Sequence, residues 1–299
     1  MFKTEMQKIS DASEKKIAFM KESPLSYIVL AALAGIYLGF GIVLIFSITG
    51  PIAAAGGGAY LKLIMGSCFG IALSLVIFAG SELFTGNNMV FAISSLEKRV
   101  GFGPIIILFV MCFIGNYLGS AFLAWLVVKG GSLSEASNQL ILKVSAMKMA
   151  LDPTEAFIRG ILCNWLVCLA VWISLRAKEE AARLIMIFWC LFAFIGSGFE
   201  HSIANQTLLS MAMFLPHGPE ISIAGFAHNQ LFVTLGNLVG GGAFVGAVYW
   251  FASPSLRMEA GASESVSNKN WKGDEKSSKP IKPYFYRKIV SDLRQTDGH

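Results

Sequence analysis

The hydrophobic positions of this chain fall into six long apolar runs separated by polar stretches. The runs cover residues 25–48, 61–83, 104–128, 155–175, 184–199 and 226–251. As an α-helix, each run can cross a hydrocarbon layer about 30 Å thick, which takes roughly 20 residues. After an interruption, the second run resumes and continues to Leu96, and the fifth continues to about Phe214. The pattern predicts an all-α membrane protein with six transmembrane helices, of which the second and fifth are broken.

The two interruptions resemble each other. The first reads GSELFTGN over residues 80–87, and the second reads GSGFEHSIAN over residues 196–205. Both open with Gly-Ser, carry a glutamate and end in asparagine. Three spans per half is an odd number, so the second half must enter the membrane from the opposite side. The chain is therefore predicted to be an inverted 3+3 repeat, in which paired glycine-interrupted spans mark the substrate site.

Charge predicts the orientation and the domains. The basic N-terminus, Lys98-Arg99, the loop after Arg176 and the C-terminal region share one side of a six-span topology, and positive charge marks the cytoplasm. Both termini are thus predicted to be cytoplasmic, in a multi-pass protein of the cell membrane. Residues 1–24 form an amphipathic segment that lies on the membrane or stays solvated. Residues 25–252 form the channel domain, and residues 253–299 form a polar tail predicted to be disordered.

Composition excludes several functional classes. Charged residues make up 14% of the chain, against about 25% in soluble domains, and the net charge of +5 forms no nucleic-acid patch. The five cysteines are odd in number, lie within apolar runs and form no C-x-x-C, so they are predicted to be free and buried. No hydrolase, zinc-protease or phosphate-loop motif occurs. We expect no enzyme activity, cofactor or metal site.

The breaks carry the candidate chemistry. Non-helical backbone at membrane depth requires protein or water as partner, and the N-terminus of each new half-helix favours an anion. Thr85 and Ser202 suit N-capping positions. His201 is the only histidine predicted at membrane depth, and such ionisable residues are usually functional. We interpret it as a supplier of a hydrogen bond or a proton; a neutral core residue is the alternative. The Thr85 hydroxyl would donate to the anion or cap a half-helix.

Further residues are assigned supporting roles. Lys148 lies in the predicted outer loop and either attracts anions to the mouth or is a solvated surface lysine. Glu82 and Glu200 are expected to bond free backbone N–H groups, with proton carriage as the alternative. The amides expected to support the breaks are Asn87, Asn116, Asn164, Asn205 and Asn237. The bulky residues that would narrow a pore, or else belong to the core or lipid face, are Phe69, Leu73, Leu83, Phe84, Val167 and Phe194.

Four stretches carry a resemblance to a known family. They read GSELFTG (80–86), CNWLVCLAVW (163–172), SGFEHSIAN (197–205) and VTLGN (233–237). The chain resembles the formate/nitrite transporter family over residues 24–250. Within the family, GIYLGFGIVLIF (35–46), CNWLVCLAVW (163–172) and AGFAHN (224–229) are most similar to the nitrite-channel branch. The resemblance implies an aquaporin-like protomer in a homopentamer, with one pore per subunit. It places the central histidine at His201, the loop threonine at Thr85 and the vestibule lysine at Lys148.

The resemblance also places the pore's narrow points. They fall on Leu73, Leu83, Phe84 and Val167 towards the cytoplasm, and on Phe69 and Phe194 towards the outside. The resulting hypothesis is a channel or transporter in the lipid bilayer for a small monovalent anion. Nitrite is the expected anion, moving passively or with proton coupling through His201, and formate or hydrosulfide is the alternative. Two other functional classes are alternatives. A water or glycerol pore would require paired Asn-Pro-Ala loops, which are absent, and a scaffold or sensor would work through residues 254–299.

Overall fold

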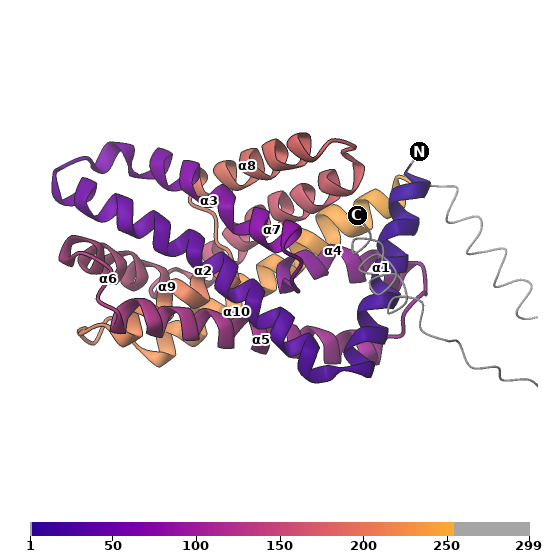
Figure 1. Cartoon of the computed structure of the whole chain (residues 1–299), viewed down its shortest axis with the longest axis horizontal. Helices are drawn as coiled ribbons and strands as arrows, with labels where there is room; N and C mark the ends of the chain where they lie inside the picture. Colours follow the sequence, from indigo (N-terminus) through magenta and orange to yellow (C-terminus); the bar gives the residue numbers. More distant parts are fainter. Residues whose placement is uncertain (1, 254–299) are drawn as a thin grey trace, which may run out of the picture. The chain divides into compact units, whose positions relative to one another are not determined.

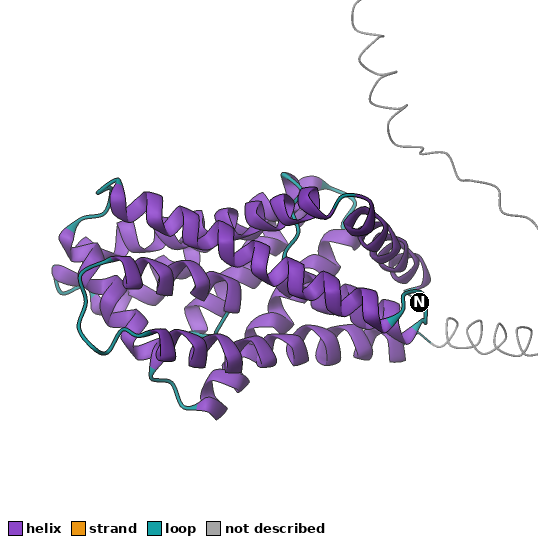
Figure 2. Cartoon of the chain, turned by 90° about the horizontal axis from the view of Figure 1, so that it is seen from below, coloured by secondary structure: helices purple, strands orange, loops and turns teal. Residues whose placement is uncertain are grey.

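The computed structural model describes residues 2–253, and the predicted tail from residue 254 onward lies outside the described residues. This part of the chain is helical without any strand (Figure 2). The helices are α1 (Lys3–Glu22), α2 (Pro24–Ala54), α3 (Leu61–Phe78), α4 (Phe84–Leu96), α5 (Phe102–Lys129), α6 (Glu135–Met149), α7 (Pro153–Arg176), α8 (Glu180–Ser197), α9 (Ser202–Phe214), α10 (Ile223–Val239) and α11 (Val248–Phe251). A 3-10 turn (Gly58–Tyr60) precedes α3, and a π-helical stretch (Gly240–Ala247) joins α10 to α11.

Six helical segments in residues 2–253 are long and apolar enough to cross a membrane. They are Pro24–Ala54, Gly58–Phe78, Phe102–Lys129, Pro153–Arg176, Glu180–Ser197 and Ile223–Phe251. The second and fifth segments end at non-helical stretches, which we call the first break (residues 79–83) and the second break (residues 198–201). The short helices α4 and α9 follow the two breaks. The predicted all-α fold with two broken spans is confirmed.

The two halves pack by the same scheme. In the first half α2 lies along α5, and in the second half α7 lies along α10. The broken spans then meet across the halves, where α3 packs against α8 (Figure 1). This arrangement places both breaks in the interior of the bundle, as an inverted repeat requires.

Small residues allow α2 and α5 to approach closely. A Cβ atom built on Gly119 of α5 would lie 1.9 Å from the carbonyl oxygen of Ala32 in α2. We expect Gly119→Ala to destabilise the protein by about 1–3 kcal/mol, because the added methyl group forces the backbones apart. The measurement is the thermal unfolding midpoint of the purified protein in detergent.

Gly103→Ala is the matched control in the same helix, since a Cβ atom there meets nothing within 4 Å. Its unfolding midpoint should be unchanged or slightly higher, because alanine favours helix more than glycine does. Equal midpoints for the Gly119 and Gly103 variants would contradict close packing at Gly119.

The N-terminal helix α1 packs against the protein. Its buried face consists of Met6, Ile9, Ser10, Ser13, Ile17 and Met20. Arg99, which follows α4, lies 3.0 Å from Asp11 and 2.7 Å from Glu14 of α1, and Arg176 lies 3.5 Å from Glu5. Thus α1 covers the end of the bundle where the basic loops gather, and α6 lies at the opposite end (Figure 1). One face of α1 is therefore covered by the protein itself.

Candidate functional site

One asparagine from each half holds each break. At the first break, Asn116 of α5 accepts from the backbone N–H of Phe84 at 3.0 Å. Its amide nitrogen donates to the carbonyl oxygens of Ala31 (2.7 Å) and Glu82 (2.8 Å). The side chain is fully buried. Asn116 therefore satisfies two backbone groups that the interrupted helix leaves without helical partners, those of Phe84 and Glu82, and ties them to α2 through Ala31.

The second break repeats this arrangement. Asn237 of α10 accepts from the backbone N–H of Ser202 at 2.9 Å. Its amide nitrogen donates to the carbonyl oxygens of Gly160 (2.8 Å) and Glu200 (2.9 Å). Asn116 and Asn237 thus hold equivalent backbone groups at the two breaks.

The two glutamates bind side chains, which corrects the expectation that they bond backbone N–H groups. Glu200 accepts from Lys148 at 2.7 Å on both oxygens and from Asn205 at 2.7 Å. Glu82 accepts from Lys16 of α1 at 2.6 Å and from Asn87 at 3.2 Å. Each break thus carries a Lys–Glu–Asn cluster. The backbone N–H groups of Glu82 and Glu200 instead donate to backbone carbonyls of the unbroken helix that precedes each broken span, α2 for Glu82 and α7 for Glu200.

Lys16 is a site residue that sequence reasoning missed, because it stood among other basic residues of the N-terminal segment. Its counterpart Lys148 comes from a different place in the repeat, the loop helix α6. No spacing in the sequence relates these two lysines. Only the folded chain brings α1 and α6 to corresponding positions beside the two glutamates.

His201 links the two half-helices. It is the N-cap residue of α9, where its Nδ1 accepts from the backbone N–H of Ala204 at 3.1 Å. Its Nε2 lies 3.0 Å from the hydroxyl oxygen of Thr85 in α4. Because Nδ1 accepts, the neutral ring carries its proton on Nε2 and donates to Thr85. The N-termini of α4 and α9 therefore meet at this pair.

The predicted capping roles of Thr85 and Ser202 are wrong. Leu83 is the N-cap residue of α4 and makes no side-chain cap, while Thr85 lies in the first helical turn. Ser202 is the first residue of α9, after the capping His201. The observed N-cap positions differ from the predicted ones because the extended backbone continues to Leu83 and His201 before each half-helix begins.

Asn164 of α7 joins Thr85 to the second half of the chain. Its amide nitrogen donates to the backbone oxygens of Thr85 (3.2 Å) and Asn237 (2.6 Å). The Cys168 thiol, one turn further along α7, also donates to the Thr85 carbonyl at 3.3 Å. These bonds fix the Thr85 backbone, so its hydroxyl faces His201 in a defined position.

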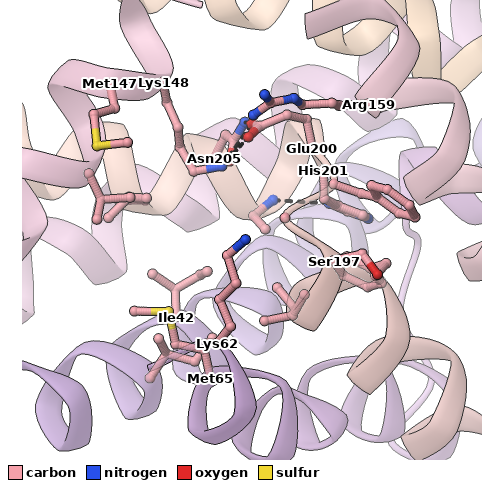
Figure 3. A pocket seen from close by; sticks show the side chains of 18 of the residues that line it. Ile42, Lys62, Met65, Met147, Lys148, Arg159, Ser197, Glu200, His201 and Asn205 are labelled. Carbon is pink, nitrogen blue, oxygen red and sulfur yellow. Dashed lines mark hydrogen bonds and ion pairs between the residues drawn. The ribbon is translucent and has the colours of Figure 1, made fainter. Parts of the chain in front are cut away.

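A cavity of about 530 Å³ opens onto His201 from the end of the bundle that carries α6 (Figure 3). We call this cavity the vestibule. Phe194, Lys148, Glu200, Asn205 and His201 line it, as do two cations that the sequence did not single out, Lys62 and Arg159. The predicted vestibule lysine, the histidine and the second Lys–Glu–Asn cluster therefore share one water-accessible space.

Beyond the vestibule the path narrows. A second cavity of only about 10 Å³ also touches His201 and is lined by Leu38, Phe69, Ala72, Leu73, Leu83, Val167, Leu191 and Phe194. This volume is at the threshold for a single water. The rings of Phe69 and Phe194 meet edge to face with their centroids 5.6 Å apart. The Phe194 ring stacks on the His201 ring with a centroid distance of 5.9 Å. Large apolar side chains thus close the path beside the histidine.

Phe84 is the one predicted narrow-point residue that lines neither cavity. Its ring packs against the rings of Phe113 and Phe109, both on α5, with centroid distances of 5.2 Å and 5.5 Å. The backbone N–H of Phe84 takes part in the first break through Asn116. Its side chain therefore anchors α4 to α5.

Comparison with known proteins gives a consistent picture. A family profile described as "Formate/nitrite transporter" matches residues 3–251. The nitrite transporter NirC of Escherichia coli (strain K12) is 41% identical over 255 residues, which cover 85% of this chain and 93% of that protein. A probable formate transporter of Methanothermobacter thermautotrophicus is 37% identical over 254 residues, 79% of this chain and 92% of that protein.

Two solved structures share the fold. One, described as an FNT family ion channel, superposes with a TM-score of 0.79 at 38% identity and covers 84% of this chain and 99% of the other. The second, a pentameric formate channel with formate bound, superposes with a TM-score of 0.69 at 29% identity. The match covers 78% of this chain and 98% of the formate channel. The range of the family profile, residues 3–251, contains the helical bundle and both breaks.

Proposed function

This chain belongs to the formate/nitrite transporter family and is a multi-pass membrane protein that transports anions, and from that premise we propose that its substrate is nitrite. The supporting relatives are the NirC proteins, at 41% identity in Escherichia coli and 39% in Salmonella typhimurium. The observation that carries the proposal is the position of the His201–Thr85 pair between the vestibule and the narrow cavity. An anion leaving the vestibule has to pass this pair.

The pair suits an anion for electrostatic reasons. The N-termini of α4 and α9 meet there, and the N-terminus of a helix carries partial positive charge. In the resting tautomer His201 donates to the Thr85 oxygen, so the Thr85 hydroxyl keeps its own proton for an incoming acceptor. Moving a bare ion into the low-dielectric interior costs about 20 kcal/mol by the idealised estimate. These donors lower that barrier, and protonation of the anion removes most of it.

Proton coupling through His201 is part of the proposal. Nδ1 is occupied by the N–H of Ala204, so the ring takes a second proton only when that bond opens. The resulting imidazolium donates one proton to the anion, the neutral acid crosses, and the ring ends neutral. Each charge crossing the membrane gains or loses about 2.3 kcal/mol per 100 mV. Since an inside-negative potential expels a bare anion, movement as the neutral acid permits uptake.

We expect His201→Asn to lower nitrite uptake driven by an inward proton gradient by about 100-fold or more. An amide donates a hydrogen bond but cannot take up and release a proton. Residual flux should no longer depend on pH. The assay is stopped-flow flux into proteoliposomes. His217→Asn is the control, since His217 lies in a loop and bonds only its neighbour Gly218. An unchanged rate and pH profile in His201→Asn would remove the ring from the mechanism.

The same assay decides the anion. Wild-type flux of nitrite, formate and hydrosulfide should be compared with and without a pH gradient, and the proposal requires nitrite to be transported best. Formate is the second candidate, because the chain shares its fold with a formate channel that has formate bound. That neighbour is pentameric, so we also propose a homopentamer, to be tested by native mass spectrometry. Both termini are proposed to be cytoplasmic, which places the vestibule outside.

A further inference from the structure

We infer that Lys62 is the residue that captures the anion in the vestibule, a role for which the sequence offered Lys148 as a candidate. This inference rests on the proposed anion transport. The vestibule is lined by three cations, Lys62, Lys148 and Arg159, and by one carboxylate, Glu200. Clefts lined by one sign of charge concentrate counter-ions and raise their association rates by about 10–10³-fold. The question is which of the three cations is available to a passing anion.

Lys148 is engaged within the protein. Its Nζ lies 2.7 Å from both carboxylate oxygens of Glu200, whose side chain is only 4% exposed. Asn205 donates to the same carboxylate and also to Asn229, which in turn donates to the backbone oxygen of Lys148 at 3.0 Å. These hydrogen bonds form a closed ring through Lys148, Glu200, Asn205 and Asn229. If Lys148 turned to an anion, Glu200 would remain buried without its counter-charge, which is strongly unfavourable.

Arg159 is also paired. Its guanidinium lies 2.8 Å from Glu155, one turn earlier on α7. Both side chains are largely exposed, at 42% and 54%, so solvent screens the pair and each partner can exchange it for water. The pair nevertheless cancels most of the field that Arg159 would project into the vestibule. Its positive charge is therefore a weaker attraction than that of a lysine with no acid beside it.

Lys62 has no hydrogen-bond or ion-pair partner in residues 2–253. It projects from the first turn of α3 into the vestibule, from the wall opposite Lys148 and Glu200 (Figure 3). Its ammonium reaches the second break, where a Cβ atom on Gly198 would lie 3.9 Å from Nζ. A cation in the first helical turn opposes the helix dipole. The fold thus gains nothing visible from this lysine, whereas an anion in the vestibule gains an unshared charge.

The two lysines consequently have different tasks. Lys148 keeps Glu200 and the second break in position, and Lys62 raises the anion concentration in front of the Phe69–Phe194 constriction. The ligand is a small monovalent anion, held by one ammonium group and released without loss of a structural ion pair. Lys62 does not touch the His201–Thr85 pair, so it should govern half-saturation more than the maximal flux.

The test compares Lys62→Gln, Lys62→Arg and the control Lys143→Gln in proteoliposomes, with nitrite flux measured against its concentration. Lys143 is an exposed lysine of α6 that does not line the vestibule. Lys62→Gln should raise the half-saturating concentration about 10-fold, with maximal flux within about twofold of wild type. Its flux at low nitrite should also lose much of its dependence on ionic strength. Lys62→Arg and Lys143→Gln should behave like wild type.

Two results would overturn the inference: half-saturation of Lys62→Gln within about twofold of wild type, or an equal rise in Lys143→Gln, which would mean a general surface potential. Thermal unfolding checks the variant, and its midpoint should not change because Lys62 has no partner to lose among residues 2–253. The proposed function fails separately, if the wild-type protein conducts none of the three anions. If the wild-type protein conducts and Lys62→Gln leaves its half-saturation unchanged, only the role of Lys62 is refuted.

Discussion

Asn116→Leu and Asn237→Leu are each expected to destabilise the protein by about 2–6 kcal/mol. Each asparagine is fully buried and bonds two backbone groups of its break, together with one carbonyl of the adjacent unbroken helix. A buried backbone group left without a partner costs about 1–3 kcal/mol, and no lipid molecule can replace the bond. Since folded proteins are stable by only about 5–15 kcal/mol in total, each variant should lose a large part of its stability.

The measurements are the thermal unfolding midpoint in detergent and the yield of monodisperse protein. Asn88→Leu is the matched control, because Asn88 is also a buried amide of the broken spans but neither of its side-chain polar atoms has a hydrogen-bond partner. Removing an unsatisfied amide should leave the midpoint unchanged or raise it. If Asn88→Leu were as damaging as Asn116→Leu, side-chain volume and not backbone bonding would explain the effect.

Lys148→Met is expected to destabilise the protein by about 3–5 kcal/mol, because it leaves the carboxylate of Glu200 buried without its counter-charge. The side chains of Lys148 and Glu200 are 20% and 4% exposed, so solvent screens this pair poorly. The double variant Lys148→Met/Glu200→Gln should recover most of the lost stability. It removes both charges, and glutamine still accepts from Asn205.

A double-mutant cycle on unfolding midpoints measures this coupling. The corresponding pair at the first break, Lys16 and Glu82, is the internal comparison. Its side chains are 24% and 12% exposed, so Lys16→Met should have a smaller effect than Lys148→Met. If Lys148→Met matched wild type in stability, Lys148 would not be the structural partner of Glu200, and it would become available for anion capture again.

These results bear on how the vestibule works. A lysine that is needed for the fold cannot also serve as a freely exchanging anion site without exposing Glu200. The closed Lys148–Glu200–Asn205 cluster and Lys62 on the opposite wall, which is unpaired within the described part of the chain, separate the two demands. The anion is therefore attracted at the mouth by one charge, and at the inner end of the vestibule it meets the His201–Thr85 donors and the aromatic side chains beside them.

The hydrophobic pattern by itself determined the number of spans, the two broken helices and the inverted repeat. These features follow from local rules, since a membrane requires apolar runs of sufficient length, and glycine and polar residues within a run interrupt it. The pattern also indicated His201, Thr85 and the amides at the breaks, because polar residues at membrane depth are rare and stand out. The family profile and the helices agree with that prediction of the fold.

Only the tertiary structure decided which polar groups face one another. Asn116 bonds backbone groups more than 30 residues away in sequence, Lys16 reaches Glu82 from a separate helix, and Lys62 faces Lys148 across a cavity. The capping role of His201 and the packing of Phe84 against α5 were likewise settled by folding. The physical reason is that the strength of a charge or hydrogen bond depends on its partner and its exposure, and both are set by contacts between helices that are distant along the chain.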